Sequence, residues 1–235
     1  MNNIKDNLKN IRERIENAAK EAGRDPDSVK LIAVSKTKPA DDINEAIKWG
    51  VTDIGENKVQ EVMDKYEIVQ PVNWHFIGHL QRNKVKYIID KVKLIHSVDS
   101  LKLAREIDKK AASKNLTMDI LIQINTGEED NKYGTTFKDA PGLIREILDE
   151  CEHINIKGLM SVVPIAEDPE EVSMNFRLTK QLFDRLADEI HHERFDAQHL
   201  SMGMTHDFET AIKEGSTMVR VGTAIFGERN YNKEG

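Results

Sequence analysis

A lysine follows the first strongly apolar segment of the chain. Residues 31–34 are Leu-Ile-Ala-Val, and Ser35 and Lys36 come directly after them. Side chains alternate in direction along a strand, so Lys36 shares a face with Ile32 and Val34. If that face points into a closed sheet, the amine stands at its mouth, where low polarity disfavours the ammonium form and favours a nucleophile. Such an amine suits a Schiff base with an aldehyde, and a lysine reaching solvent from a strand end is the structural alternative.

Two glycine-containing segments near the C-terminus could bind an anion. Ser201 and Gly203 follow one apolar run, and Gly222 and Thr223 follow another. Glycines let backbone N–H groups approach an anion closely, and hydroxyl groups add further donors. Ordinary turn chemistry is the alternative for each segment alone. Combined with Lys36, the two segments predict a phosphorylated aldehyde as the ligand.

An arginine lies on a strand-like segment close to the second glycine. Arg220 shares a face with Met218 and Gly222. A guanidinium group inside a sheet needs a hydrogen-bond acceptor, which a pyridine nitrogen could supply. The alternative is a structural ion pair with Glu56 or Asp53.

The site residues must be positioned by strands and helices, and strand-like and helix-like segments alternate along the chain. The strand patterns cover 29–35, 52–56, 73–79, 92–98, 118–125, 154–162, 197–204 and 217–227. The helix patterns between them cover 41–50, 57–69, 82–90, 101–114, 140–151, 169–191 and 207–215. This alternation indicates parallel βαβ units, and eight strands in under 250 residues favour a closed barrel over an open sheet. The prediction is an α/β protein, a single (β/α)8 TIM barrel over residues 1–235, in which function gathers at the carboxyl ends of the strands.

The N-terminal segment adds a helix before the first strand. Ile4, Leu8, Ile11 and Ile15 recur at helical spacing, and Gly23 ends the pattern. We expect residues 1–24 to form a helix packed on the barrel. Because no full helix pattern follows residue 227, this helix could cover the place of a missing eighth one.

The composition excludes several classes of protein. The chain has 235 residues, of which 39% are hydrophobic and 32% charged, with a net charge of -7. This is a globular composition, and the diffuse negative charge argues against nucleic-acid or membrane partners. One cysteine, Cys151, allows no internal disulfide and favours a cytoplasmic setting. No apolar stripe is left over for a large interface, so we expect a monomer.

Two histidines could suggest a metal site. His75 and His79 are four residues apart. On a strand that spacing separates them by ~13 Å, which is too far for one shared ion. No metal is expected.

Several stretches together are similar to one known family. They are AVSKTKP (33–39), GENKVQE (55–61), WHFIGHLQRNK (74–84), IHSVDSLKLA (95–104), GLM (158–160), LSMGMTHDFETAI (200–212) and GSTMVRVGTAIFG (215–227). In these stretches the chain closely resembles the pyridoxal phosphate homeostasis proteins. Lys58, where the family often has tyrosine, and Ser161-Val162, where it often has Thr-Ile or Thr-Met, are small departures.

The resemblance implies a fold, a cofactor and a set of contacts. The fold is a barrel like the N-terminal domain of alanine racemase, and the cofactor is pyridoxal 5′-phosphate (PLP). The resemblance implies a Schiff base between PLP and Lys36, with Asn57 near the cofactor and Arg220 beside the ring nitrogen. It places Ser201, Gly203, Gly222 and Thr223 around the phosphate.

Three functions fit these residues. The favoured one is a non-catalytic PLP carrier that takes part in intracellular vitamin B6 homeostasis and passes PLP to apo-enzymes. The alternative is an amino-acid racemase, which needs a second base opposite Lys36. Of the four tyrosines, Tyr66, Tyr87, Tyr133 and Tyr231, none lies at a predicted strand end, and Tyr133 is the nearest candidate. A lysine aldolase without cofactor is a third possibility, which Arg220 disfavours because that chemistry has no ring nitrogen.

Overall fold

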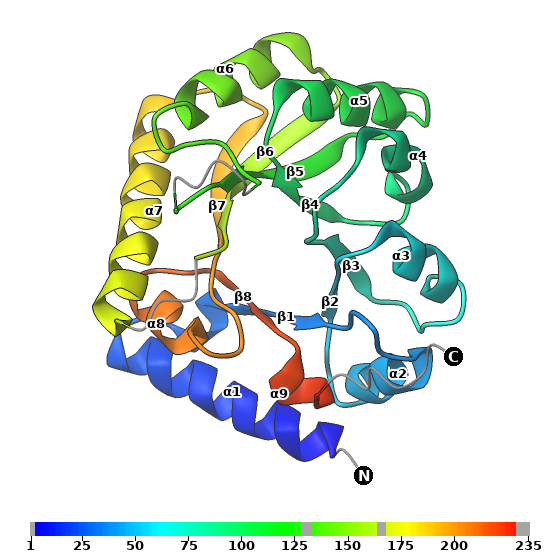
Figure 1. Cartoon of the computed structure of the whole chain (residues 1–235), viewed down its shortest axis with the longest axis vertical. Coiled ribbons are helices and arrows are strands. Elements are labelled where there is room, and N and C mark those ends of the chain that lie inside the picture. The colour runs from blue at the N-terminus through cyan, green and yellow to red at the C-terminus, as the bar shows by residue number, and fades with distance from the viewer. Residues whose placement is uncertain (1–2, 128–132, 164–167, 229–235) are drawn as a thin grey trace.

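The strands pair in chain order and close into a barrel in the computed structural model, which describes residues 3–127, 133–163 and 168–228 (Figure 1). Every pair is parallel, including the closing pair between the first and last strands. Within the described residues the strands are β1 (Lys30–Val34), β2 (Asp53–Glu56), β3 (Asn73–Phe76), β4 (Leu94–Val98), β5 (Met118–Ile124), β6 (Ile154–Ser161), β7 (Phe195–Ser201) and β8 (Met218–Val221). The predicted TIM barrel is confirmed.

Helices surround the barrel on its outer side (Figure 1). They are α1 (Ile4–Glu21), α2 (Ala40–Lys48), α3 (Val59–Lys65), α4 (Val85–Ile88), α5 (Leu101–Ala112), α6 (Ala140–Glu150), α7 (Pro169–Glu189), α8 (Phe208–Lys213) and α9 (Thr223–Phe226), with the 3₁₀ turns η1 (Pro26–Ser28) and η2 (Arg82–Lys84). No helix in this described part of the chain is long and apolar enough to cross a membrane.

Alternation along the strands divides the buried side chains into two groups. Ile32, Leu94, Leu121, Met160 and Met218 form a cluster of their own. The apolar residues between them along the same strands, with the inner faces of the helices, belong to a separate and larger core. The small cluster is therefore the apolar part of the barrel interior, as the two-residue period of each strand requires.

Helix α1 has one buried face. Its buried residues recur at helical spacing, and they are Ile4, Leu8, Ile11, Ile15, Ala18 and Ala19. Gly23 follows the helix with φ of 66°, a left-handed conformation that glycine adopts without strain.

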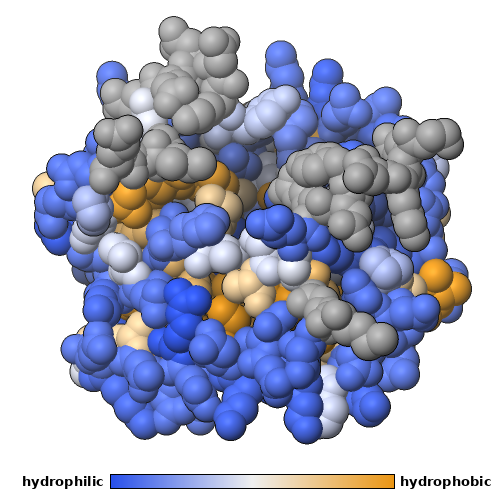
Figure 2. Space-filling model, turned by 60° about the horizontal axis from the view of Figure 1, so that its bottom comes forward, coloured by the Kyte–Doolittle hydropathy of each residue, from blue (hydrophilic) through white to orange (hydrophobic). Residues whose placement is uncertain are grey.

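The face of the molecule seen in Figure 2, where the bottom of Figure 1 comes forward, is mostly hydrophilic, and hydrophobic residues show mainly in its hollowed central part.

Polar contacts join α1 to the C-terminal part of the barrel. Arg14 donates twice to the carboxylate of Glu209 on α8, at 3.0 and 2.8 Å, and Asn7 donates to the carbonyl oxygen of Ile225 on α9 at 2.9 Å. Helix α9 has only four residues, so it cannot cover the outer side of β8 as a full barrel helix would. The predicted N-terminal helix is present, and it contacts α8, α9 and α2.

Three predicted strands end at least three residues earlier in the structure than in the sequence pattern. The third was expected to reach residue 79, but β3 ends at Phe76. The seventh was expected to reach residue 204, but β7 ends at Ser201. The eighth was expected to reach residue 227, but β8 ends at Val221 and α9 begins at Thr223. Apolar residues such as Ile225 and Phe226 continue the hydrophobic run through this helix, so hydrophobicity alone could not locate the boundary.

Candidate functional site

A pocket opens at the carboxyl ends of the strands. Its volume is about 370 Å³, within the range of small-molecule sites. Most of its walls come from the segments that end β1, β2, β3, β7 and β8. They are Val34, Lys36, Lys38, Asn57, Ile77, Val162, Met204, Thr205, His206, Arg220, Gly222, Thr223 and Gly227. The structure therefore brings together five of the predicted site residues, Lys36, Asn57, Arg220, Gly222 and Thr223.

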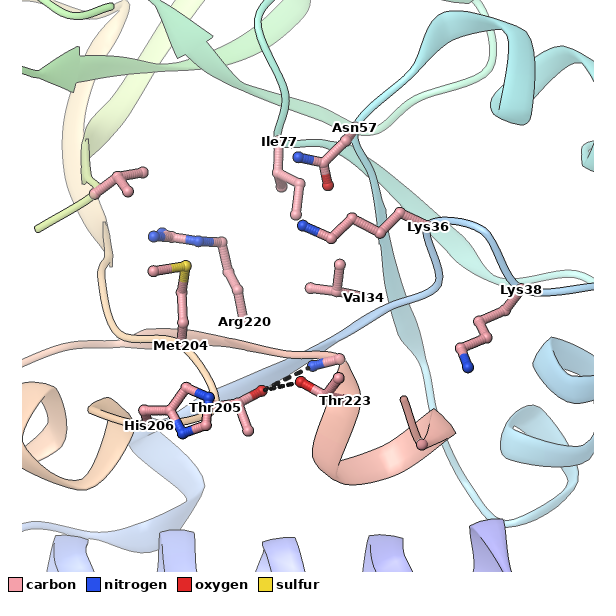
Figure 3. A pocket seen from close by; sticks show the side chains of 13 residues that line it. Val34, Lys36, Lys38, Asn57, Ile77, Met204, Thr205, His206, Arg220 and Thr223 are labelled. Carbon is pink, nitrogen blue, oxygen red and sulfur yellow. Dashed lines mark hydrogen bonds between the residues drawn. The ribbon is translucent and has the colours of Figure 1, made fainter. Parts of the chain in front are cut away.

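Lys36 enters this pocket from the loop after β1. It lies two residues beyond Val34, the last residue of the strand, and its side chain extends toward Arg220 on the neighbouring strand β8 (Figure 3). The next residue, Thr37, has φ of 65°, which lies in the left-handed region. A side chain other than glycine is uncommon there, so other contacts must hold this conformation.

A carboxylate fixes the strained residue after Lys36. The backbone N–H of Thr37 donates to Glu61 on α3 at 2.5 Å. The same Glu61 oxygen accepts from the amine of Lys65 at 2.8 Å. The loop that carries Lys36 is thus attached to the first and last turns of α3.

A second carboxylate fixes the residue before Lys36. The hydroxyl of Ser35 donates to Glu56 at 2.7 Å, and Lys65 donates to the same Glu56 oxygen at 2.8 Å and to the carbonyl of Ser35 at 3.0 Å. Glu56 is fully buried, and this burial raises its pKa against the opposing effect of Lys65. Lys36 therefore stands between two residues that are both held through Lys65. Neither Glu61 nor Lys65 was identified from the sequence, since neither has a motif of its own.

Arg220 is a buried cation held by oxygen acceptors. Its Nη1 donates to the hydroxyl and carbonyl oxygens of Ser201 at 2.6 and 2.7 Å, and its Nη2 donates to the carbonyl of Ser161 at 2.7 Å. Burial lowers its pKa to about 10, with a smaller opposing effect from Asp207, so it remains charged at neutral pH. The alternative of an ion pair with Glu56 or Asp53 is wrong, because in the described residues those carboxylates pair with Lys65, Lys30 and His75.

Hydroxyl and backbone groups converge at another edge of the pocket. The Oγ1 atom of Thr205 accepts from the backbone N–H of Gly222 at 3.4 Å and from the hydroxyl of Thr223 at 3.3 Å (Figure 3). Gly222 also packs closely on β1, since a Cβ there would lie 3.2 Å from the carbonyl oxygen of Val34. These hydrogen bonds connect the loop after β7 with the loop after β8, as expected for an anion site on the last two strands.

The predicted loop after β7 is partly misplaced. Ser201 is still within β7 and fully buried, and neither Ser201 nor Gly203 lines the pocket. Gly203 has φ of 93°, and a Cβ there would lie 2.6 Å from the Cβ of Ala211. The chain therefore turns at this glycine, and Met204, Thr205 and His206 reach the pocket instead. Thr205 was missed because the strand was expected to continue to residue 204.

Asn57 lines the pocket directly after β2. Its Oδ1 atom is buried and has no hydrogen-bond partner within the described residues. Gly78 makes room beside it, because a Cβ on Gly78 would lie 2.2 Å from the carbonyl oxygen of Asn57. A buried carbonyl oxygen without a partner has a free-energy cost unless a ligand or water satisfies it.

Tyr133, the nearest candidate for a second base, does not line the pocket that contains Lys36. The ring of Tyr133 is 57% exposed and stacks on His79, with 3.6 Å between ring centroids. Neither it nor Tyr66 or Tyr87 lines the pocket, and Tyr231 lies outside the described residues. Met204 lines the pocket, whereas Met160 is packed in the barrel interior. Burial raises the pKa of the Cys151 thiol to about 11, as expected for an inert packing residue.

Two histidines lie inside the barrel on the side of Arg220 away from the pocket. His75 Nε2 is 2.9 Å from the carboxylate of Asp53, and His75 Nδ1 is 2.9 Å from Nε2 of His96. Burial lowers the pKa of both imidazoles, although Asp53 opposes the effect at His75. Burial alone would raise the pKa of Asp53, but hydrogen bonds from His75 and Thr52 bring it well below its usual range. The described residues contain no cluster of three or more possible metal ligands.

Comparison with known proteins places the chain in a family. The family model for the alanine racemase N-terminal domain matches residues 6–230. The chain is 44% identical to a pyridoxal phosphate homeostasis protein of Aquifex aeolicus, over 97% of this chain and 100% of the relative. It is 38% identical to the protein of that name in Escherichia coli K12, over the full length of both. The chain belongs to the family of pyridoxal phosphate homeostasis proteins.

Solved structures agree with this assignment. PipY of Synechococcus elongatus, a structure described as having PLP bound, is 32% identical, with a TM-score of 0.78 over 92% of this chain and 100% of that one. An alanine racemase from Corynebacterium glutamicum is 19% identical, with a TM-score of 0.68 over 97% of this chain and 64% of that one. The second likeness shows the fold alone. Two of the positions where this chain differs from the usual family residue are Val162 and Lys58. Val162 lines the pocket, and Lys58 does not.

The buried histidines predict a loss of stability in acid. Because their folded-state pKa values are lowered, they stay neutral while the unfolded chain binds protons below pH ~6.5. The free energy of unfolding should therefore fall between pH 7 and pH 5, with a limit of about 2 kcal/mol for a histidine that stays fully neutral in the folded protein. Urea unfolding at both pH values measures this, and His96→Gln should make the fall smaller.

The control is the exposed His191→Gln, which is expected to keep the wild-type difference. An equal pH difference in His96→Gln and wild type would contradict the prediction, since His96 would then have to be protonated in the folded protein.

Proposed function

We propose that the chain is a PLP-binding protein of vitamin B6 homeostasis, which carries and buffers PLP without catalysing a reaction. The observation that supports it most directly is the pocket itself. An amine, a buried guanidinium and a set of hydroxyl and backbone donors face one cavity of about 370 Å³. The structure of the PipY relative, at 32% identity and described with PLP bound, favours the same ligand.

The pocket residues fit the three functional parts of PLP. Lys36 offers an amine for the aldehyde, Arg220 offers a cation near the ring, and Thr205, Gly222 and Thr223 offer donors to the phosphate. The buried Oδ1 of Asn57 lacks a partner in the described residues, as expected of an atom facing a ligand. PLP supplies an electrophilic carbonyl conjugated with a pyridine ring.

Lys36 is proposed as the residue that binds the aldehyde covalently. Its amine adds to the carbonyl carbon, and the carbonyl oxygen leaves as water, which gives a Schiff base. The fixed backbone at Ser35 and Thr37 limits where this amine can be, so the residue is positioned before the ligand arrives. Arg220 donates hydrogen bonds and does not give up a proton, so a ring nitrogen beside it stays unprotonated.

The phosphate end involves a revised set of residues. We propose that Thr205 joins Gly222 and Thr223 as a direct contact. Ser201 and Gly203 then support this site from behind, Ser201 by binding Arg220 and Gly203 by turning the loop. Lys38, whose amine donates to the carbonyls of Phe226 and Glu228 at 2.8 and 2.9 Å, holds the neighbouring α9 segment in place.

The racemase alternative needs a base on the face of the ligand opposite Lys36. The described residues offer no tyrosine in the pocket, and Tyr133 stacks on His79 instead. The racemase-like fold supports the alternative only at the level of the fold, and fold does not determine activity. We therefore favour a carrier whose recipients are PLP-dependent apo-enzymes in the cytoplasm. The third function, a lysine aldolase without cofactor, is disfavoured because its chemistry has no ring nitrogen for Arg220 to contact.

Borohydride reduction tests the linkage. We expect purified protein loaded with PLP to be yellow and to lose the colour on reduction, with the cofactor fixed on the peptide that contains Lys36. Lys36→Ala should abolish the fixation. Lys38→Ala is the matched control, because it removes another amine of the same pocket, and it should retain the label. Label on any other lysine in the wild type would reject the assignment.

Loss of a phosphate donor tests the second part of the site. Thr223→Ala should release PLP about tenfold faster, since a hydrogen bond to a charged group contributes about 1.5–3 kcal/mol. Reduction of the PLP that remains should still label Lys36. Thr210→Ala on α8, which does not line the pocket, is the control. Equal retention in both variants would mean that the phosphate is bound elsewhere.

Hydrogen exchange at Cα separates the carrier from the racemase. Alanine or serine incubated with PLP-loaded protein in D₂O should gain no deuterium at Cα over many equivalents. NMR of the amino acid measures this, with Lys36→Ala as the background. Sustained Lys36-dependent exchange would establish catalysis and overturn the carrier proposal.

A further inference from the structure

A continuous chain of hydrogen bonds runs through the barrel interior from Arg220. Arg220 Nη1 contacts the hydroxyl of Ser201 at 2.6 Å, and that hydroxyl is 3.0 Å from Nδ1 of His96. His96 Nε2 and His75 Nδ1 are 2.9 Å apart, and His75 Nε2 is 2.9 Å from Asp53. The chain thus connects a pocket cation at the carboxyl end of β8 with a carboxylate at the start of β2.

The two ends of this chain fix the direction of every bond in it. A guanidinium group can only donate, so the hydroxyl of Ser201 accepts from Arg220. At the other end Asp53 can only accept, and with two neutral rings between them the hydroxyl of Ser201 must donate to Nδ1 of His96. His96 then carries its proton on Nε2 and donates to Nδ1 of His75. His75 in turn carries its proton on Nε2 and donates to the carboxylate of Asp53. Both imidazoles are neutral and have the same tautomer.

The opposite direction is chemically inconsistent with these neighbours. It would require a proton on Nδ1 of both histidines and a donor at Asp53. Asp53 accepts from Thr52 at 2.7 Å and is paired with Lys30 at 3.3 Å, so it is an ionised acceptor. An imidazolium would satisfy both contacts of His75, but it would place a further charge at a buried position. Burial lowers the pKa of both rings, which favours the neutral forms.

The surroundings of the chain make a break costly. Ser201, His96, His75 and Asp53 are at most 2% exposed. Apolar side chains form part of the interior around the chain, so a polar group that loses its partner against them has a desolvation cost. Beyond Asp53 lies a small cavity of about 50 Å³, near Lys30 and His199 at the amino ends of the strands. The chain therefore occupies most of the barrel's length.

We propose that His96 and His75 are positioning residues, which act through Ser201 to fix the guanidinium of Arg220 against the bound cofactor. Without the chain, the hydroxyl of Ser201 could rotate and Arg220 would keep only two carbonyl acceptors. The part that concerns the cofactor rests on the proposed function. The direction of the chain does not, because it follows from the protein's own contacts.

NMR of the histidine rings tests the direction in protein free of PLP. Two-bond ¹H–¹⁵N spectra of protein labelled with ¹⁵N-histidine distinguish protonated from unprotonated ring nitrogens. We expect Nε2 protonated and Nδ1 unprotonated in both His75 and His96. A proton on Nδ1 of either ring, or an imidazolium at neutral pH, would overturn the proposal.

A matched pair of serine variants tests the link to Arg220. Ser201→Ala removes the bridging hydroxyl, so the Nδ1 signal of His96 should shift and bound PLP should be released about tenfold faster. Ser97→Ala is the control, because its hydroxyl is buried without a partner in the described residues. It should leave both readouts as in wild type. Equal effects of the two variants would reject the link.

A conservative replacement tests the histidine itself. In His96→Gln the amide can accept from Ser201 and donate to His75, whereas in His96→Leu neither bond can form. We expect His96→Gln to keep the wild-type PLP absorption spectrum and release rate, and His96→Leu to change both. If His96→Leu does not fold, the serine pair and the ring spectra still decide the question.

These outcomes are separable from those of the proposed function. Borohydride labelling of a lysine other than Lys36 would reject the PLP site, while the ring spectra without cofactor would still decide the direction. Correct labelling of Lys36 with unchanged release in Ser201→Ala and His96→Leu would retain the PLP site and reject the positioning role.

Discussion

The burial of one guanidinium group is the constraint on which the pocket depends. Moving a cation into a protein interior costs several kcal/mol even after relaxation, and an opposite charge at contact distance is the usual compensation. Within the described residues Arg220 has oxygen acceptors instead, two carbonyls and a hydroxyl. At about 1.5–3 kcal/mol for each bond to a charged group, three such bonds are comparable with the desolvation cost. The carbonyls come from β6 and β7, so the barrel must close correctly for the cation to be tolerated.

The same geometry explains why the cation can face a ligand. A carboxylate partner would take the donors of Arg220 and neutralise its field in the pocket. Carbonyl oxygens fix its orientation and leave the net charge in place. Lys36 is held differently, through a backbone anchored by Glu56, Glu61 and Lys65, which leaves its amine facing the cavity. The two cations of the site therefore come from neighbouring strands, β1 and β8, and have independent supports.

Strand periodicity and the βα alternation were enough to predict the barrel and the direction of Lys36. Both depend on local patterns that a single sequence contains. The role of Ser201 could not be found in this way, because it depends on where β7 ends and thus on the turn at Gly203. The contact between His75 and His96 depends on the pairing of β3 with β4, and the adjoining ladder of β4 with β5 has an irregular register between Ile95 and Val98. Hydrophobic runs carry no information on such offsets.

The contacts of α1 with the C-terminal elements have a consequence for folding during translation. Asn7 meets Ile225 across 218 positions of sequence, and β1 pairs with β8, so the earliest elements are completed by the latest ones. During translation the apolar side of α1 emerges long before the segments that cover it have been synthesised. Such distant pairing slows folding, because the entropy of closing the longest loop is lost before its contacts form. The buried face of α1 therefore stays exposed on the nascent chain until the segment that contains Ile225 has been synthesised.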